Sequence, residues 1–169
     1  MEFSAAYPWR PTRARQTYGL IGAVVICFVV AGVGGAVTSS SLDDWYPALA
    51  KPAWTPPDWV FGPVWTVLYL MMAVAAWLVW RANGWRLARG ALALFAGQLA
   101  LNLAWSSIFF GLRSPGWAAV EVLVLWLAIA ATAGAFRLHS RLAAALLLPY
   151  LAWTTYAAAL NWAIFWMNR

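Results

Sequence analysis

Charged residues are scarce in this chain. Only 9% of its 169 residues are Asp, Glu, Lys or Arg, whereas 64% are hydrophobic. Soluble domains carry roughly 25% charged residues, so this chain cannot cover a globule in water. The composition therefore predicts an integral membrane protein. Because each helical crossing needs about 20 apolar residues, the length leaves room for five crossings in one compact bundle.

Residues that support common active sites are equally few. The single cysteine, Cys27, lies in an apolar run and excludes an intramolecular disulfide. The single histidine, His139, has no neighbouring ligands in the sequence, so we expect no metal site and no cofactor. The motifs of hydrolases and transferases are also missing from the sequence, which makes an enzyme of those classes improbable.

Five apolar runs predict an all-α integral membrane protein, a bundle of five transmembrane helices. The runs occupy residues 17–38, 59–80, 88–110, 117–136 and 142–167, and together they form one membrane domain, 17–169, behind a basic tail, 1–16. Eight arginines flank one side of the predicted spans, against three basic residues on the other. The positive-inside rule then puts the amino terminus in the cytoplasm, and the first loop and carboxyl terminus outside.

The basic residues behind the net charge of +6 lie at the ends of the apolar runs and do not cluster into a nucleic-acid-binding face. We therefore expect no nucleic-acid partner. An all-helical bundle with this bias is typical of the bacterial cytoplasmic membrane, with the lipid bilayer as its surroundings.

The first loop contains the unusual stretch KPAWTPPDW, residues 51–59. Three prolines in nine residues exclude a transmembrane helix, and two tryptophans are unusual for a solvated loop. Proline also limits the conformational freedom that a segment loses when it closes. The stretch therefore predicts a stiff lid across the mouth of the bundle, with Trp54 and Trp59 directed at the cavity below.

Polar residues inside the third apolar run are candidates for function. Gln98 and Asn102 are four residues apart and share one helix face, which Trp105 and Phe109 approximately continue. These side chains could line a ligand cavity with aromatic walls and amide hydrogen bonds. The amides could equally well bond neighbouring helices to each other, and the spacing does not separate the two interpretations.

The other runs add further candidates. Trp153 and Leu160 lie on an aromatic surface of the fifth run, where Ala157 leaves room for a helix contact or a ligand. Trp65 and Trp126 fall inside their runs, and we expect some such indoles to face the bundle interior or a cavity. Glu121 lies about one turn into the fourth run, where we expect exposure at the membrane interface.

Small residues also recur at four-residue spacing. Ala93 and Gly97 form such a row on the third run, as do Gly32 and Ala36 on the first. These rows allow close approach of helices, either within the monomer or across a homodimer, and we expect a homodimer through such faces.

Three segments resemble the signature segments of the TspO/MBR family. They are WYPALAKPAWTPPDWVFGPVWTVLY at 45–69, GQLALNLAWSSIFFG at 97–111 and PYLAWTTYAAALNW at 149–162. The resemblance covers all five runs in order, from about residue 17 to 167. Family members are called tryptophan-rich sensory proteins in bacteria, and translocator protein or peripheral benzodiazepine receptor in mitochondria.

The resemblance implies a five-helix bundle whose first loop covers a cavity for hydrophobic ligands. Family ligands include porphyrins such as protoporphyrin IX and haem, sterols, and synthetic benzodiazepines. Residues at matching family positions are Trp45, Trp65, Asn102, Trp153 and Ala157. With the aromatic, amide and aliphatic neighbours added, the predicted ligand-binding set is Trp45, Trp54, Phe61, Trp65, Tyr69, Gln98, Asn102, Trp105, Phe109, Trp126, Trp153, Ala157 and Leu160.

The resemblance is compatible with three functions: a receptor or sensor of porphyrins, a transporter of porphyrin or sterol, and a light-dependent porphyrin-degrading enzyme in which Trp45 and Trp153 take part. No internal duplication is visible, so alternating access of the usual kind lacks support. Lys51 is the nearest candidate partner for porphyrin propionates. Reversed sterol-motif patterns begin at Arg15 and Arg89, and are weak signals.

Overall fold

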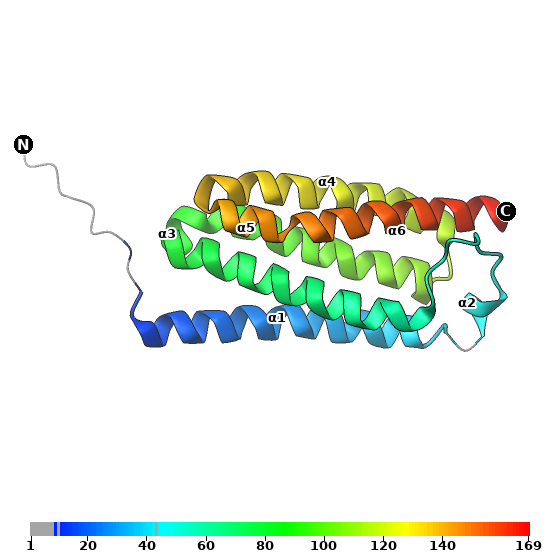
Figure 1. Cartoon of the computed structure of the whole chain (residues 1–169), viewed down its shortest axis with the longest axis horizontal. Coiled ribbons are helices and arrows are strands. Elements are labelled where there is room, and N and C mark those ends of the chain that lie inside the picture. The colour runs from blue at the N-terminus through cyan, green and yellow to red at the C-terminus, as the bar shows by residue number, and fades with distance from the viewer. Residues whose placement is uncertain (1–8, 10, 43) are drawn as a thin grey trace, which may run out of the picture.

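The computed structural model describes Trp9, residues 11–42 and residues 44–169. Most of the predicted tail, residues 1–8 and 10, and also Asp43, lies outside the described residues. All regular secondary structure in the described ranges is helical, and no strand occurs there. The long helices run side by side (Figure 1).

The helices are α1 (Arg13–Ser39), α2 (Trp45–Ala48), α3 (Phe61–Ser106), α4 (Pro115–His139), α5 (Arg141–Leu146) and α6 (Leu148–Met167). A 3-10 turn, η1 (Asp58–Val60), precedes α3, and a π-helical turn, η2 (Ser107–Gly111), follows it. Four segments are long and apolar enough to cross a membrane: α1, Asp58–Gly111, α4 and Arg141–Met167. The all-helical class predicted from composition is therefore confirmed.

The long helix α3 doubles back on itself at Gly84 (Figure 1). A straight helix of its 46 residues would extend about 69 Å, more than twice the hydrocarbon core of about 30 Å. Gly84 has φ 66° and ψ 175°, values outside the helical region, and splits α3 into a first arm, 61–83, and a second arm, 85–106. The connection expected between residues 80 and 88 is therefore shorter than predicted, because both arms stay helical up to this glycine.

Local sequence signals explain where the other helices begin. Thr12 caps α1 by accepting a hydrogen bond from the amide of Arg15, and Ser140 caps α5 through the amide of Ala143. Pro115 occupies the first position of α4, where its missing N–H costs nothing. Pro149 lies in the first turn of α6, where a proline leaves no intrahelical hydrogen bond unmade.

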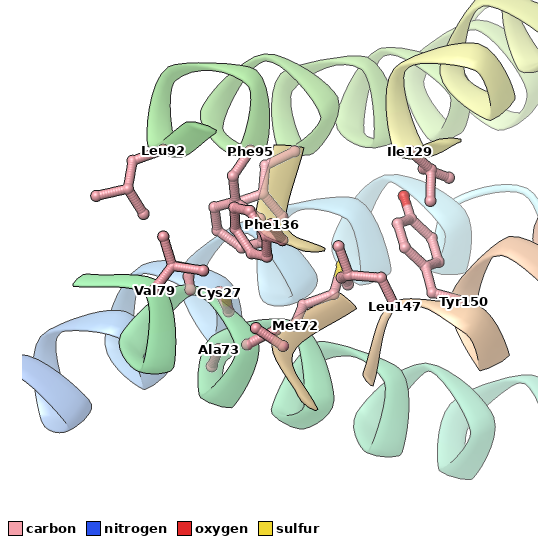
Figure 2. Close-up of a cluster of buried hydrophobic side chains, with 14 of the residues drawn as sticks. Cys27, Met72, Ala73, Val79, Leu92, Phe95, Ile129, Phe136, Leu147 and Tyr150 are labelled. Atoms are coloured by element: carbon pink, nitrogen blue, oxygen red, sulfur yellow. The ribbon is translucent and has the colours of Figure 1, made fainter. Parts of the chain in front are cut away.

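The core lies where α1, both arms of α3, α4 and the start of α6 meet (Figure 2). Phe95 of the second arm stacks on Phe136 of α4, with ring centroids 5.8 Å apart. Met72, Ile129 and Tyr150 are fully or almost fully buried beside them. Side chains therefore fill the interior of the bundle between these helices.

Gly84→Ala should destabilise the protein. Its positive φ is unfavourable for alanine, and an added Cβ would lie 2.8 Å from the indole of Trp9. We expect a loss of about 1–3 kcal/mol, measured as a lower midpoint of thermal unfolding in detergent. Gly90→Ala is the matched control, because Gly90 is helical and nothing lies within 4 Å of its added Cβ. Equal midpoints for the two variants would contradict this account of the turn.

Candidate functional site

The first loop lies across the end of the bundle where α6 finishes (Figure 1). The side chain of Asn168 exchanges two hydrogen bonds of 2.9 Å with the backbone of Ala50. The hydroxyl of Tyr156 donates to the carbonyl of Trp54 at 2.8 Å, and that of Ser41 donates to the carbonyl of Phe110 at 2.8 Å. Side chains thus tie this loop to α6 and η2 at several separate points.

An ion pair adds to these contacts at the solvent-facing side of the loop. Arg113, between η2 and α4, lies 3.0 Å from the carboxylate of Asp44. The pKa of Asp44 is below its ordinary value, because the amide of Trp45 donates to the carboxylate and the guanidinium of Arg113 lies beside it. Both partners are exposed, so the pair contributes little energy and mainly orients the loop.

Lys51 is directed at the loop itself. Its ammonium group donates to the carbonyl of Tyr46 at 2.6 Å and lies 4.5 Å from the centre of the Tyr46 ring. Tyr46 is buried, and burial raises its pKa to about 12, so its hydroxyl stays protonated. Lys51 therefore binds backbone carbonyls of the short helix α2 and does not line the cavity below it.

A cavity of about 80 Å³ lies beneath the loop, between α1, α3, η2 and α6. Its walls are mainly aromatic and aliphatic, and seven of the thirteen residues predicted from the sequence belong to them. These seven are Phe61, Trp65, Trp105, Phe109, Trp153, Ala157 and Leu160. The structure therefore brings together residues from three segments that are far apart in the sequence.

Hydrogen bonds and ring contacts orient the aromatic walls. Trp105 stacks on Phe109, with centroids 5.4 Å apart and planes 24° apart. Its indole N–H donates to Oδ1 of Asn161 at 3.1 Å, and the amide of Asn161 in turn donates to the carbonyl of Pro115 at 2.8 Å. Trp105 is partly buried, and its satisfied indole N–H and its stacking on Phe109 fix its ring plane, so this wall is pre-organised.

The two predicted amides of the third apolar run lie deeper than the cavity. Asn102 accepts a hydrogen bond from the hydroxyl of Tyr69 and donates one of 2.9 Å to the hydroxyl of Tyr150. The amide nitrogen of Gln98 lies 3.8 Å from the sulfur of Met72. Of the two interpretations left open above, the structure shows interhelical bonding, and Gln98, Asn102 and Tyr69 do not line the cavity.

Three predicted tryptophans also lie outside the cavity wall. Trp45 contacts Phe109 edge-on at 5.6 Å, and the half-exposed Trp54 contacts Tyr156 in the same way. Trp126 donates from its indole to the hydroxyl of Thr155 at 2.8 Å, which joins α4 to α6. Trp45 and Trp54 therefore pack the loop against η2 and α6, and Trp126 contributes to the packing of α4 on α6.

Sequence reasoning missed the other half of the wall, which consists of Thr38, Leu42, Tyr46, Asp58, Phe110, Asn161 and Ile164. Tyr46 and Asp58 lie within the first family-like segment, which was a usable signal. Thr38 and Leu42 come from the end of α1 and the start of the loop, where no pattern marks them. Asp58 is the one charged side chain in the wall of this cavity.

Glu121 differs from its expected setting. It lies two turns into α4, and both carboxylate oxygens are buried without a hydrogen-bond partner among the described residues. The predicted exposure at the interface is therefore wrong for its oxygens. No lining residue of the cavity comes from α4, so Glu121 is not part of this site.

Comparisons with known proteins cover nearly the whole chain. The model of the TspO/MBR family matches residues 23–167. The translocator protein of Homo sapiens is 42% identical over 166 residues, which cover 97% of this chain and 94% of the relative. The tryptophan-rich protein TspO of Chlorobaculum tepidum is 40% identical over 156 residues, with 91% and 98% covered. The tryptophan-rich sensory protein of Cereibacter sphaeroides is 40% identical over 148 residues, with 86% and 92% covered. The chain therefore belongs to the TspO/MBR family and is an integral membrane protein.

Proposed function

We propose that the protein is a membrane receptor or sensor that binds a porphyrin, such as protoporphyrin IX or haem, or a related flat hydrophobic ligand. The observation that carries this proposal is the aromatic-walled cavity beneath the first loop. A flat apolar ring stacks well on indole and phenyl faces, and a few polar groups at the wall orient it. The names of the relatives, sensory protein and translocator protein, support a role in sensing or moving a ligand.

Five membrane crossings are the arrangement we propose, with each arm of α3 crossing separately. At 1.5 Å per residue each arm is about 33 Å long, close to the hydrocarbon core of about 30 Å. Arginines gather at the end of the bundle that holds the Gly84 turn: Arg13, Arg15, Arg81, Arg86, Arg89, Arg137 and Arg141. The positive-inside rule then makes that end cytoplasmic, with residues 1–16 as its tail, and puts the first loop and carboxyl terminus outside a bacterial cytoplasmic membrane.

The homodimer is also a proposal. Ala93 and Gly97 are exposed on the second arm of α3, and nothing lies within 4 Å of a Cβ added to Gly97. Small residues on such a face allow a helix of a second copy to approach closely.

The first loop must move, or the walls must rearrange, before such a ligand enters. The cavity of about 80 Å³ is well below the roughly 300–1,000 Å³ of typical small-molecule sites. A neighbouring hollow of about 410 Å³ between α1 and α3 shares Thr38, Leu42 and Trp65 with it, so displacement of these side chains would join the two spaces. We propose that the loop is a lid whose side-chain contacts hold it closed between binding events.

The charge of the cavity wall constrains how a porphyrin binds. Asp58 is acidic and the wall has no basic side chain, so two propionates inside it would be repelled and desolvated. We propose that the macrocycle enters the cavity while the propionates stay at the solvent side, where Arg113 lies.

Ala157→Phe should fill the cavity and lower the affinity for protoporphyrin IX at least tenfold, measured by tryptophan quenching in the dark. Loss of about 1.4 kcal/mol of binding energy suffices for that change, and an overfilled site usually loses more. Ala159→Phe is the matched control, because Ala159 is exposed on the same helix and does not line the cavity. Unchanged quenching in Ala157→Phe would show that the ligand does not bind in this cavity.

Asn168→Ala should speed up ligand release. It removes both hydrogen bonds between α6 and Ala50, each of which contributes about 1 kcal/mol, so we expect dissociation to be about 30-fold faster in stopped-flow displacement. Asn83→Ala is the control, since the amide of Asn83 bonds Val79 near the Gly84 turn. Equal dissociation rates in the wild type and in Asn168→Ala would contradict the proposal that these contacts hold the loop closed over the ligand.

Two further measurements test the other functions that the sequence left open. Light-dependent degradation yields a distinct porphyrin product on illumination, and Trp153→Phe should abolish it, whereas binding alone returns unaltered porphyrin. Transport predicts movement of porphyrin across a vesicle membrane that depends on the protein.

A further inference from the structure

A second hollow lies toward the Gly84 end of the bundle, between α1 and the second arm of α3. It measures about 320 Å³ and none of its lining residues is charged. We call it the basic-end groove; its residues are Gly19, Gly22, Ala23, Ile26, Ala76, Trp77, Trp80, Trp85, Leu92, Phe95, Ala96 and Leu99. Mostly small side chains form its α1 wall, and three indoles line the end nearest the Gly84 turn.

The groove is open because of the glycines on α1. A Cβ added to Gly19 would lie 2.3 Å from the ring of Trp80, so this indole packs directly against the helix backbone. One turn further along, nothing lies within 4 Å of a Cβ added to Gly22. The resulting space reaches the roughly 300–1,000 Å³ of small-molecule sites, which the cavity under the loop does not.

Two exposed arginines are in line with this groove. Arg15 lies four residues before Gly19 and therefore on the same face of α1. Arg89 lies four residues after Trp85 and three before Leu92, so it shares their face on α3. A third guanidinium, that of Arg81, lies 4.4 Å from the ring centre of Trp77, which is a groove residue.

No acidic side chain neutralises these arginines within residues 11–42 and 44–169. The acidic residues there are Asp44, Asp58 and Glu121. Asp44 and Asp58 belong to the first loop, and Glu121 lies in the first half of α4, nearer that loop than the Gly84 turn. The only ion pair in these ranges is that of Arg113 with Asp44, at the opposite end. The basic-end groove thus combines an apolar trough with positive charge at its mouth that no acidic side chain of the described ranges pairs.

We propose that the basic-end groove binds one anionic phospholipid of the cytoplasmic leaflet. An acyl chain lies along the apolar trough, and the phosphate meets Arg15 and Arg89 at the level of Trp85. Guanidinium groups favour phosphate oxygens, and indoles favour the headgroup region, so both ends of the groove match one lipid. The site is separate from the cavity under the loop and does not depend on the proposed porphyrin ligand.

Charge decides between this occupant and two others. A sterol offers a single hydroxyl, which gives two guanidinium groups no counter-charge. A second copy of the chain packed symmetrically on this groove would bring its own Arg15 and Arg89 against the same positive charge. Of these three occupants, the anionic phospholipid is the one that supplies both an apolar chain and a negative group.

The test is native mass spectrometry of the full chain in detergent with phosphatidylglycerol or phosphatidylcholine of identical acyl chains. We expect the wild type to retain one phosphatidylglycerol and little phosphatidylcholine. Arg15→Gln/Arg89→Gln should weaken phosphatidylglycerol retention about 25-fold, about fivefold for each guanidinium. Arg137→Gln/Arg141→Gln, at the same end on α4 and α5, should leave retention unchanged.

A second pair of variants tests the trough. Gly22→Leu should fill it and abolish retention of phosphatidylglycerol, whereas Gly134→Leu, on the exposed face of α4 with open space around it, should not. Thermal unfolding checks that all four variants fold. Equal retention of the two lipids, equal loss in the two arginine pairs, retention of added sterol in their place, or a dimer that excludes lipid would each overturn the proposal.

Discussion

The buried hydrogen bonds of Asn102 hold the bundle together at the level of the site. Its amide accepts from Tyr69 on the first arm of α3 and donates to Tyr150 on α6, so one side chain joins three helical segments. In a membrane no water replaces a lost partner, which makes such a satisfied amide a strong constraint on register. Trp65 of the cavity wall packs against both tyrosines, at 5.8 Å and 6.1 Å. The position of that wall therefore depends on Asn102, although Asn102 does not touch the cavity.

The two ends of the bundle are built for different surroundings. At one end, side chains tie the proline-rich loop to α6 and η2 above a cavity that holds a carboxylate. At the other end, α3 reverses at one glycine among several arginines. A tight turn needs few polar groups, whereas the 21 residues between α1 and α3 need many contacts to stay in place. The proposed porphyrin site consequently lies under the loop, where packing is interrupted.

Much of the fold was predictable because apolar runs and charge are local properties. The five runs coincide with α1, the two arms of α3, α4 and α5 with α6, within a few residues. Half of the cavity wall was also predicted, since aromatic residues such as Trp105 and Phe109 follow one helix face. Thr38 and Leu42 were not predictable, because they reach the cavity only after the chain has turned into the loop. The direction of Lys51 depended on carbonyl groups of α2, which no sequence pattern displays.

The sequence by itself determined that the chain is a helical membrane protein, where its helices begin and end, and which end carries the arginines. Composition and periodicity suffice for these properties, because each depends on residues within a few turns of one another. Only the tertiary structure decided that Gln98 and Asn102 bond helices and that Trp105, Trp153 and Ala157 share one cavity. Helical spacing says which side chains share a face, but the neighbour that this face meets is decided by the packing of distant segments.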